Sequence, residues 1–566
     1  MTTEACYTRS DFSSVHCLPF TVHISQPALR PSRLYFFILT LILAALACSR
    51  PDLPLDYSRI TPLPGMNGLT QAANTANAPA PLAPPTATLV PASPPVPDLP
   101  IATPRPTVDI TLSPTPDIPR TSPLDRQTTE HYTVQRNDTL SEIGQRYGVS
   151  AEQIAAANGI QVTDTLFTGQ ALLIPLPADQ PVGPDLKIIP DSEFVYGPGN
   201  IGFNLDGFIQ AQHGYLADYT EDIPNSYLDG SAGTTTMSGS EIIQFVAQHY
   251  SVNSRVLLAV LEYQSGWVTD PRPGDKTLTY PMRRVEAGRE GLYRQLTWTA
   301  NQLNGGYYAW RASWLVSFVF PDGSLKIIAP GLNAGTVAIQ NFFSKVLNAA
   351  DWTQAMSPDG FLSTYWAMFG NRFAYAWEPL VPPDLVQPTL QLPFESEKIW
   401  AFTGGPHGAW DTGSAWAALD FAPPAEAEGC TLSDEWVVAS APGLIVRAEN
   451  GSVLEDLDGD GYEETGWVLF YMHVESRDRV AVGARVNAGD RLGHPSCEGG
   501  VANGTHVHFA RKYNGEWIPA DGPIPFILDG WISAGLGQEY DGKLTLGLIS
   551  IEACDCRAPE NEISRP

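Results

Sequence analysis

Residues 504–509 read Gly-Thr-His-Val-His-Phe, which sets His506 and His508 at alternate positions of a predicted strand. Alternate side chains of a strand point to the same face, so both imidazoles are predicted to face one cleft. Zinc takes neutral imidazole and carboxylate, and a catalytic zinc site keeps three protein ligands with one position open for water. The other polar candidates for that cleft lie upstream in the segments TGGPHGAW, AALDF and YMHV, and they are His407, Asp420 and His473.

From Gln391 to Trp531 these segments resemble the lysostaphin-type and beta-lytic-type zinc endopeptidases, which cut the peptides of bacterial cell walls. The resemblance implies a mainly antiparallel β domain that binds one Zn²⁺ per chain. The ligands it implies are His407, Asp420 and His508. It also implies that His473 and His506 act on the water and the transition state as the catalytic pair.

The carboxylate ligand has two candidates. His407 and Asp411 give the His-x-x-x-Asp spacing that is commonest in the family, whereas Asp420 lies further along the chain in an apolar segment. The beta-lytic branch has a longer, Trp-containing insert here and an Asp in such a strand, which favours Asp420. A degenerate, metal-free binding domain is the competing interpretation of the whole cluster. Such family members usually lose ligands, and this chain keeps them all.

The composition indicates several domains and excludes one class of partner. The chain has 566 residues, 43% of them hydrophobic, with 33 Lys and Arg against 61 Asp and Glu and a net charge of −28. Nucleic-acid binding requires clustered Lys and Arg, so we expect no nucleic-acid partner. The acidity also gives no support for an electrostatic grip on anionic lipid.

The N-terminal part reads as an export signal followed by a stalk. Residues 34–47 form an apolar run that is short for a membrane span and suits a signal peptide. The run ends Ala-Leu-Ala before Cys48, which resembles a bacterial lipobox and implies lipidation of Cys48. A plain secretory signal or an uncleaved anchor are the alternatives. Residues 1–47 are thus the predicted signal and residues 48–128 a Pro/Thr-rich linker, which places the protein in the cell envelope.

Residues 129–178 have the order strand, helix, helix, strand and resemble the lysin motif (LysM), which binds the N-acetylglucosamine chains of peptidoglycan or chitin. Family contacts come from the loops after the first strand and the second helix. They nominate Asn137, Asp138, Thr139, Asn158, Gly159 and Ile160. Each of these residues has an alternative interpretation as a capping or turn residue. Residues 179–195 are a predicted linker.

Residues 196–385 are predicted to be mainly helical, with helices over Ser240–His249 and Ser254–Tyr263 that each begin with a Ser cap. Residues 262–267, Glu-Tyr-Gln-Ser-Gly-Trp, resemble the catalytic helix of the lysozyme-like lytic transglycosylases. Gln264 stands where that family has its catalytic Glu, and an amide cannot donate the proton that glycosidic cleavage requires. A non-catalytic glycan-binding or structural domain is therefore favoured over a working glycosidase.

The C-terminal region 386–556, followed by a tail of residues 557–566, carries two further features. Its four cysteines suggest disulfides in an exported protein. A Cys554–Cys556 pair would close a strained loop, which favours a long-range bridge such as Cys430–Cys497. A run of alternate aspartates opens like a calcium loop but lacks the closing Glu, so a solvated hairpin tip is favoured over Ca²⁺ at Asp456, Asp458 and Asp460.

Together these patterns predict a multidomain chain with a βααβ LysM module, a mainly α lysozyme-like domain and a mainly antiparallel β metallopeptidase domain. The predicted function is a secreted or membrane-anchored zinc endopeptidase that cleaves the peptide cross-links of peptidoglycan. Its expected partners are peptidoglycan and, through the N-terminal lipid or signal, the membrane. The alternative is a non-catalytic scaffold that binds peptidoglycan and activates another wall hydrolase.

Overall fold

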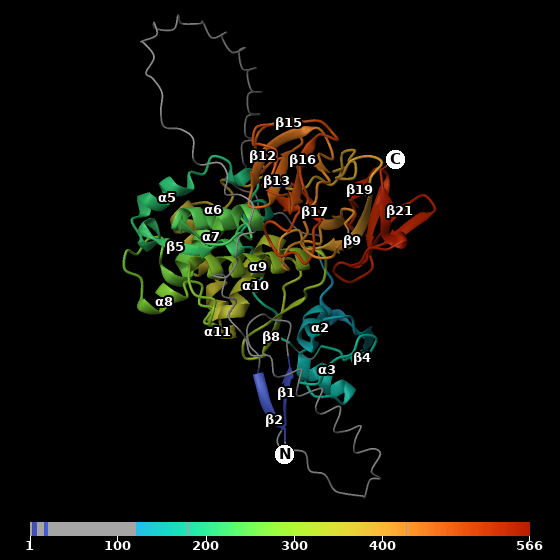
Figure 1. Ribbon diagram of the computed structural model, residues 1–566. Coiled ribbons are helices and arrows are strands. Elements are labelled where there is room, and N and C mark those ends of the chain that lie inside the picture. Colours follow the sequence, from blue (N-terminus) through green and yellow to red (C-terminus); the bar gives the residue numbers. More distant parts are fainter. Residues whose placement is uncertain (1–2, 8–15, 21–119, 178–179, 426, 566) are drawn as a thin grey trace, which may run out of the picture. The chain divides into compact units, whose positions relative to one another are not determined.

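A computed structural model describes residues 3–7, 16–20, 120–177, 180–425 and 427–565 (Figure 1). Cys48, the apolar run of the predicted signal and most of the predicted linker lie outside the described residues. The chain divides into two units, Met1–Pro95 and Val96–Pro566. In the first, Thr3–Tyr7 (β1) pairs antiparallel with His16–Phe20 (β2). Among the described helices, none has both the length and the apolar character needed to cross a bilayer.

Residues 130–174 of the second unit have the predicted β-α-α-β order. Strand β3 (Glu130–Thr133) pairs antiparallel with β4 (Ala171–Ile174), and helices α2 (Leu140–Tyr147) and α3 (Ala151–Asn158) lie between them in the chain. Both helices begin with a reciprocal capping box, from Thr139 and Ser150, which satisfies their first free N–H groups. Their apolar faces meet in a small core of their own that includes Leu140, Ile143, Ile154, Leu172 and Ile174.

The middle region is helical, as predicted. Its helices are α4 (Asp191–Phe194), α5 (Leu205–Gln212), α6 (Gly239–Tyr250), α7 (Ser254–Ser265), α8 (Asp275–Thr279), α9 (Leu292–Arg311), α10 (Ala334–Val346), α11 (Ala349–Ala355) and α12 (Phe361–Phe369). Two hairpins accompany them, β5 (Thr220–Pro224) with β6 (Thr234–Ser238), and β7 (Ser317–Val319) with β8 (Leu325–Ile327).

The caps of α6 and α7 differ from the prediction. Ser238, not Ser240, caps α6, because its side chain and that of Glu241 form a reciprocal capping box. Asn253, not Ser254, caps α7, and its side chain accepts from the backbone of Arg255. In both helices the N-cap lies one or two positions before the predicted Ser. The spacing of apolar residues shows where a helix lies but does not fix its first residue.

The C-terminal region is an antiparallel sheet with strand order β15-β12-β13-β14-β17-β10-β9-β23, in which β18 also pairs with β17. Its strands are β9 (Ile399–His407), β10 (Ala418–Ala422), β12 (Gly443–Glu449), β13 (Ser452–Asp456), β14 (Trp467–Met472), β15 (Arg485–Val486), β17 (Val507–Tyr513), β18 (Glu516–Trp517) and β23 (Glu562–Ser564). Smaller sheets contain β11 (Val437–Val438) with β16 (Arg491–Gly493), and β19 (Ile527–Leu528), β20 (Trp531–Gly535), β21 (Gly542–Leu546) and β22 (Ile549–Glu552).

The two faces of the large sheet enter different cores. On one face Val468, Phe470 and Ala510 join the core of the helical region. On the other face Leu469, Tyr471 and Phe509 pack within the C-terminal region. His508 and Ala510 are two residues apart on β17, so their side chains point to the same face of the sheet. His508 therefore lies on the face that the helical region covers.

Hydrogen bonds also join the helical region to the sheet. Tyr307 Oη donates to Glu516 Oε2 at 3.1 Å, and the Arg311 guanidinium lies 2.6 Å from Glu516 Oε1. Ser251 Oγ donates to the Gly515 carbonyl at 2.6 Å. The helical region and the sheet are therefore connected by polar contacts as well as by a shared apolar core.

Two features of the C-terminal region differ from the prediction. Residues 557–566, predicted as a tail, contain strand β23, which pairs with β9. The strand is held there by Ile563, whose side chain is 2% exposed and packs into the core of the C-terminal region. The predicted Cys430–Cys497 disulfide is present. Cys554 and Cys556 are also bonded to each other, contrary to the expectation that so short a loop would stay open.

Glu455 on β13 yields a prediction for the pH dependence of stability. Burial raises its pKa from 4.5 to about 8, although Tyr471 Oη donates to its carboxylate. The unfolded chain loses this proton near pH 4.5 and the folded chain near pH 8. The contribution of Glu455 to stability is therefore complete below pH 4.5 and is lost as the pH rises to about 8.

Glu455→Gln removes this ionisation while keeping the shape of the side chain. We expect the variant to gain stability over wild type by on the order of 5 kcal/mol at pH 9 and by much less at pH 5, since the pKa rises from 4.5 to about 8 and one pKa unit corresponds to about 1.4 kcal/mol. Urea unfolding of both proteins at pH 5, 7 and 9 measures the difference. A difference that stays constant with pH would show that Glu455 does not titrate in this range.

Candidate metal centre

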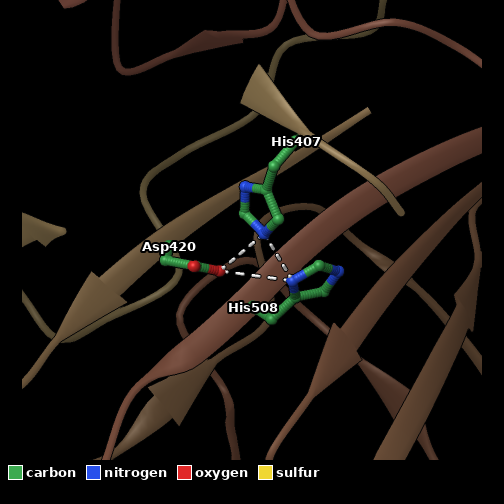
Figure 2. A group of neighbouring side chains, drawn as sticks. All are labelled: His407, Asp420 and His508. Carbon is green, nitrogen blue, oxygen red and sulfur yellow. Dashed lines mark hydrogen bonds and ion pairs between the residues drawn. The ribbon is translucent and has the colours of Figure 1, made fainter. Parts of the chain in front are cut away.

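Antiparallel pairing brings three predicted ligands together from strands far apart in the sequence. His407 is the last residue of β9, Asp420 lies on β10, and His508 lies on β17 directly opposite Asp420. His407 Nε2 and His508 Nδ1 each lie 3.2 Å from Asp420 Oδ1 and 2.9 Å from each other (Figure 2). One ligand atom from each residue lies within 4.8 Å of the other two. The predicted set His407, Asp420 and His508 is therefore a single buried cluster.

Gly404 makes room for the carboxylate. It lies opposite Asp420 in the β9–β10 ladder, and a Cβ at this position would come within 2.6 Å of Asp420 Oδ2. Real Cβ atoms do not approach a neighbour so closely, so any larger residue at Gly404 would displace the carboxylate. The register of β9 and β10 thus fixes the position of the carboxylate relative to the two imidazoles.

Backbone carbonyls decide which nitrogen of each imidazole carries a proton. His407 Nδ1 lies 2.8 Å from the Gly405 carbonyl, and His508 Nε2 lies 3.0 Å from the Ala409 carbonyl. A carbonyl only accepts hydrogen bonds, so these two nitrogens are the donors. In the neutral rings the lone pairs are then on His407 Nε2 and His508 Nδ1, the two atoms that face Asp420.

Three electron-pair donors therefore converge in a buried place. His407 is 2% exposed, Asp420 8% and His508 9%. Asp420 Oδ1 forms no well-oriented hydrogen bond of its own although it is fully enclosed. Such a carboxylate is costly unless a cation balances it. Two imidazole nitrogens and one carboxylate oxygen are a donor set that suits catalytic zinc, so the residues fit that ion.

The pKa values follow the same electrostatics. Burial opposes the charged form of His407, yet the Asp420 carboxylate beside it raises the pKa of His407 above its usual value. Burial likewise opposes ionisation of Asp420, but His407 and His506 hold the pKa of Asp420 well below its usual range. Burial lowers the pKa of His508. The cluster thus holds a carboxylate that attracts positive charge, whether from a proton or from a metal ion.

The predicted catalytic pair lies beside this cluster. His473 directly follows β14, and His506 precedes β17; their ring centroids are 4.5 Å apart. His506 Nε2 is 3.8 Å from Asp420 Oδ1. His473 has a left-handed backbone with φ 65°, which is rare outside glycine and is often found at functional sites. Burial, with His506 and His508 nearby, lowers the pKa of His473 well below its usual value, so this ring is neutral at pH 7.

Asp411, the alternative carboxylate, lies elsewhere. Its Oδ2 accepts a hydrogen bond from Tyr250 Oη at 3.1 Å, and its Oδ1 accepts from the backbone of Thr412. It also adopts a left-handed backbone with φ 58°. Asp411 therefore shapes the loop between β9 and β10 and fastens it to α6, whereas Asp420 faces the two histidines.

We expect Asp411→Ala to keep its metal and to lose about 1 kcal/mol of stability through the Tyr250 hydrogen bond and the backbone strain. Elemental analysis for zinc and urea unfolding measure the two effects. Asp411→Asn is the matched control, because the Asn oxygen can still accept from the backbone of Thr412 and Asn tolerates the left-handed region. Loss of zinc from Asp411→Ala with the fold intact would show that Asp411 is the ligand.

The nominated LysM residues mostly have structural roles. Asp138 Oδ2 accepts from Tyr132 Oη and from the backbone of Gln135, and Thr139 caps α2. The Asn158 side chain bonds the backbone of Leu173 in both directions. Asn137 and Gly159 supply left-handed turns, and Ile160 follows α3 half-buried. The capping interpretation thus describes the side chains of Asp138, Thr139 and Asn158, and contacts to sugar at the six positions stay a prediction.

Two other sequence candidates lie outside the cluster. Asp456 accepts backbone N–H groups from Asp458, Gly459 and Gly461, so the acidic turn satisfies its buried carboxylate internally and Ca²⁺ there is unsupported. Gln264 is 1% exposed within α7. Its side chain therefore does not face solvent.

No pattern in the sequence indicates two residues that shape the site, Tyr540 and Glu539. Tyr540 stacks on the His407 ring with centroids 4.2 Å apart, and its backbone is left-handed with φ 69°. Glu539 accepts from the backbone of Gly408, which follows His407. The segment Glu-Tyr-Asp-Gly reads only as a turn, and no periodicity places it against a strand more than a hundred residues earlier.

Several parts of the chain are similar to known proteins. Residues 132–175 match the family model described as LysM domain, and residues 187–381 match the one described as LasA, N-terminal domain. Two proteins named Protease LasA, from Pseudomonas aeruginosa strains UCBPP-PA14 and PAO1, are 26% and 25% identical over 357 residues, which is 59% of this chain and 75% of theirs. A structure titled "A Novel M23 Metalloprotease Pseudoalterin from Deep-sea" shares 24% identity over 30% of this chain and 96% of its own, with a TM-score of 0.25.

The model of the LasA N-terminal domain spans the region for which a lysozyme-like fold is predicted, and that prediction is unconfirmed. The similarity to protease LasA extends well beyond that region, since it covers 59% of the chain. It supports a peptidase, and the LysM match supports binding to peptidoglycan. The chain thus contains a segment that matches the LysM domain, a segment that matches the LasA N-terminal domain, and similarity to protease LasA over 59% of its length.

Proposed function

We propose that the protein is an exported zinc endopeptidase that cleaves the peptide cross-links of peptidoglycan and is held on the glycan by its LysM domain. The observation that carries this proposal is the convergence of lone pairs from His407 Nε2 and His508 Nδ1 on the buried Asp420 carboxylate. We further propose that the signal in residues 1–47 exports the chain and that Cys48 anchors it by lipid.

His407, Asp420 and His508 would hold the zinc ion. When bound, zinc supplies a water acidified towards neutral pH and polarises the substrate carbonyl. His473 Nδ1 lies 3.0 Å from the Glu498 carbonyl and His506 Nδ1 lies 2.7 Å from the Gly504 carbonyl, so each ring carries its proton on Nδ1. The lone pair of each ring is then on Nε2. These two nitrogens take up a proton in one step and donate it to the developing oxyanion or the leaving amine in the next.

The LysM domain supports the proposal by its effect on local concentration. A module that binds glycan strands holds the peptidase near the cross-links of the same polymer, so the second encounter becomes intramolecular. Modest affinity for the glycan is then enough to raise the effective substrate concentration at the metal centre.

Digestion of purified peptidoglycan by the full chain, followed by mass spectrometry of the soluble fragments, tests the proposal. We expect new amine and carboxyl termini in the peptides, no new reducing ends, and about one zinc per chain by elemental analysis. The Asp420→Asn variant is the matched negative control. Binding to insoluble peptidoglycan without any cleavage by the zinc-loaded protein would favour the non-catalytic scaffold.

A further inference from the structure

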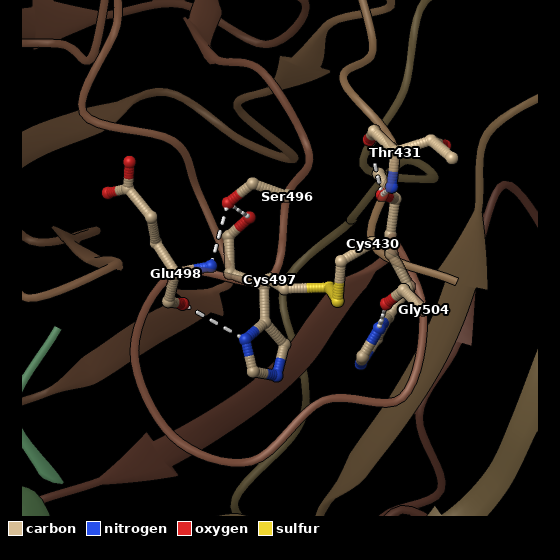
Figure 3. Close-up of a disulfide and its surroundings, with 9 residues drawn as sticks. Cys430, Thr431, Ser496, Cys497, Glu498 and Gly504 are labelled. Carbon is tan, nitrogen blue, oxygen red and sulfur yellow. Dashed lines mark hydrogen bonds between the residues drawn. A yellow bond between two sulfur atoms is a disulfide. The ribbon is translucent and has the colours of Figure 1, made fainter. Parts of the chain in front are cut away.

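The Cys430–Cys497 disulfide lies beside the two candidate catalytic histidines. It joins residues 67 apart in the sequence and links the segment before β11 to the loop between β16 and β17 (Figure 3). Cys430 is exposed and Cys497 is half-buried. Both line a cavity of about 500 Å³, together with Thr431, Ser496 and Thr505. The bridge is therefore reachable from solvent.

The loop that Cys497 anchors contacts both imidazoles through its backbone. Glu498, the next residue, places its carbonyl 3.0 Å from His473 Nδ1, and Gly504 places its carbonyl 2.7 Å from His506 Nδ1. Ser496 on the other side of the bridge donates its backbone N–H to the His473 carbonyl at 2.7 Å. The position of one short loop thus sets the tautomer and the orientation of both rings.

Other contacts also hold the first part of this loop: Arg479 pairs with the Glu498 carboxylate, Ser476 donates two hydrogen bonds to that carboxylate, and the Gly499 N–H donates to the Asp229 carbonyl. Gly499 and Gly500 both have left-handed backbones, and Val501 is 99% exposed, so this part of the loop has no apolar anchor. Noncovalent links to the Cys430 segment are hydrogen bonds between Thr431 and Thr505 and one from the Thr505 backbone to the Gly429 carbonyl. Each such bond contributes only about 1 kcal/mol. The covalent bridge is therefore the strongest link between this loop and the Cys430 segment.

The metal ligands are restrained in another way. Asp420 and His508 lie within paired strands, and His407 ends β9. Strand pairing does not depend on the bridge, whereas the carbonyls of Glu498 and Gly504 belong to the loop. Opening the bridge is thus expected to disturb the catalytic pair while leaving the ligands in place.

We infer that the Cys430–Cys497 disulfide is a positioning element for His473 and His506, and that the enzyme needs it for turnover rather than for metal binding. This inference rests on the proposed function. Cys430 and Cys497 act through the loop and do not themselves contact the reacting atoms.

The test compares Cys430→Ser/Cys497→Ser with Cys554→Ser/Cys556→Ser in the full chain. The control variant also removes one disulfide of the same region. The turn that this disulfide closes contacts the loop after Cys497 through an exposed hydrogen bond from Asn503 to Asp555. For the first variant we expect unchanged zinc content and KM on soluble peptidoglycan fragments, and kcat lower by about tenfold to a hundredfold, because small displacements of catalytic groups have effects of this size. The control should match wild type in all three quantities.

A second readout does not depend on activity. In protein labelled with ¹⁵N-histidine, nitrogen chemical shifts distinguish the two imidazole tautomers. We expect the His473 and His506 signals to move from a fixed Nδ1–H tautomer towards a mixture in Cys430→Ser/Cys497→Ser, while those of His407 and His508 stay unchanged. If wild type itself proves inactive, the proposed function fails, and these signals still decide whether the bridge positions the rings.

Reduction of the folded wild-type protein covers the case in which the serine variant does not fold. A water-soluble phosphine breaks the S–S bond with one water, giving two thiols and the phosphine oxide. Turnover should fall in wild type and in Cys554→Ser/Cys556→Ser alike, with the same tautomer change. Unchanged kcat and unchanged His473 and His506 signals after the bridge is opened would overturn the inference. Loss of zinc after the bridge is opened, or an equal loss of kcat in the control variant, would also overturn the inference, because the bridge would then only stabilise the fold in general.

Discussion

His508→Ala is expected to abolish both zinc binding and peptide hydrolysis. The residue lies on β17 between β14 and β10, so its backbone is held by strands on both sides and the fold should survive the change. The substitution removes one of the three ligands, and His407 and Asp420 alone are too weak a pair to retain the ion. Elemental analysis should give close to zero zinc against about one per chain in wild type, and wall digestion should fall to background.

His213→Asn is the control for this experiment. His213 is an exposed cap of α5 in a left-handed conformation that Asn tolerates, and it lies outside the ligand cluster. This variant should keep its zinc and its activity. Full zinc content in His508→Ala would mean that the metal is held by other groups, and the assignment of His407, Asp420 and His508 would then be wrong.

His473→Ala and His506→Ala are expected to separate metal binding from catalysis. Neither residue belongs to the three-residue cluster, so zinc content should stay near that of wild type. Turnover should fall by about a hundredfold or more, because a positioned acid, base or oxyanion donor contributes at least that much in the transition state. Zinc analysis and the initial rate of wall digestion measure the two quantities on the same preparation.

Binding to insoluble peptidoglycan serves as the folding control for these two variants, since the LysM domain has its own core. Zinc loss from either variant with wall binding intact would make that histidine a ligand. Full zinc and full turnover in both would mean that other residues move the protons, with Tyr540 the first to test because it stacks on His407.

The sequence predicted the site better than its surroundings. The His-x-His alternation and the apolar setting of Asp420 locate the ligands, because strand periodicity is a local property. Which carbonyl orients each imidazole is a tertiary property, and no pattern in the chain shows that Ala409 lies against His508. For the same reason, the sequence did not reveal that the site face of the sheet is covered by the helical region, or that Gln264 is buried.

Strand β23 closes one edge of the large sheet, and that closure affects how copies of the chain meet. Glu562–Ser564 hydrogen-bonds to β9, the strand that ends at His407. Without these residues, β9 would present a free row of N–H and C=O groups to solvent, which is a template for pairing with another chain. A truncated protein that lacks this strand would therefore tend to self-associate along β9, and the first consequence would be aggregation close to the metal centre rather than global unfolding.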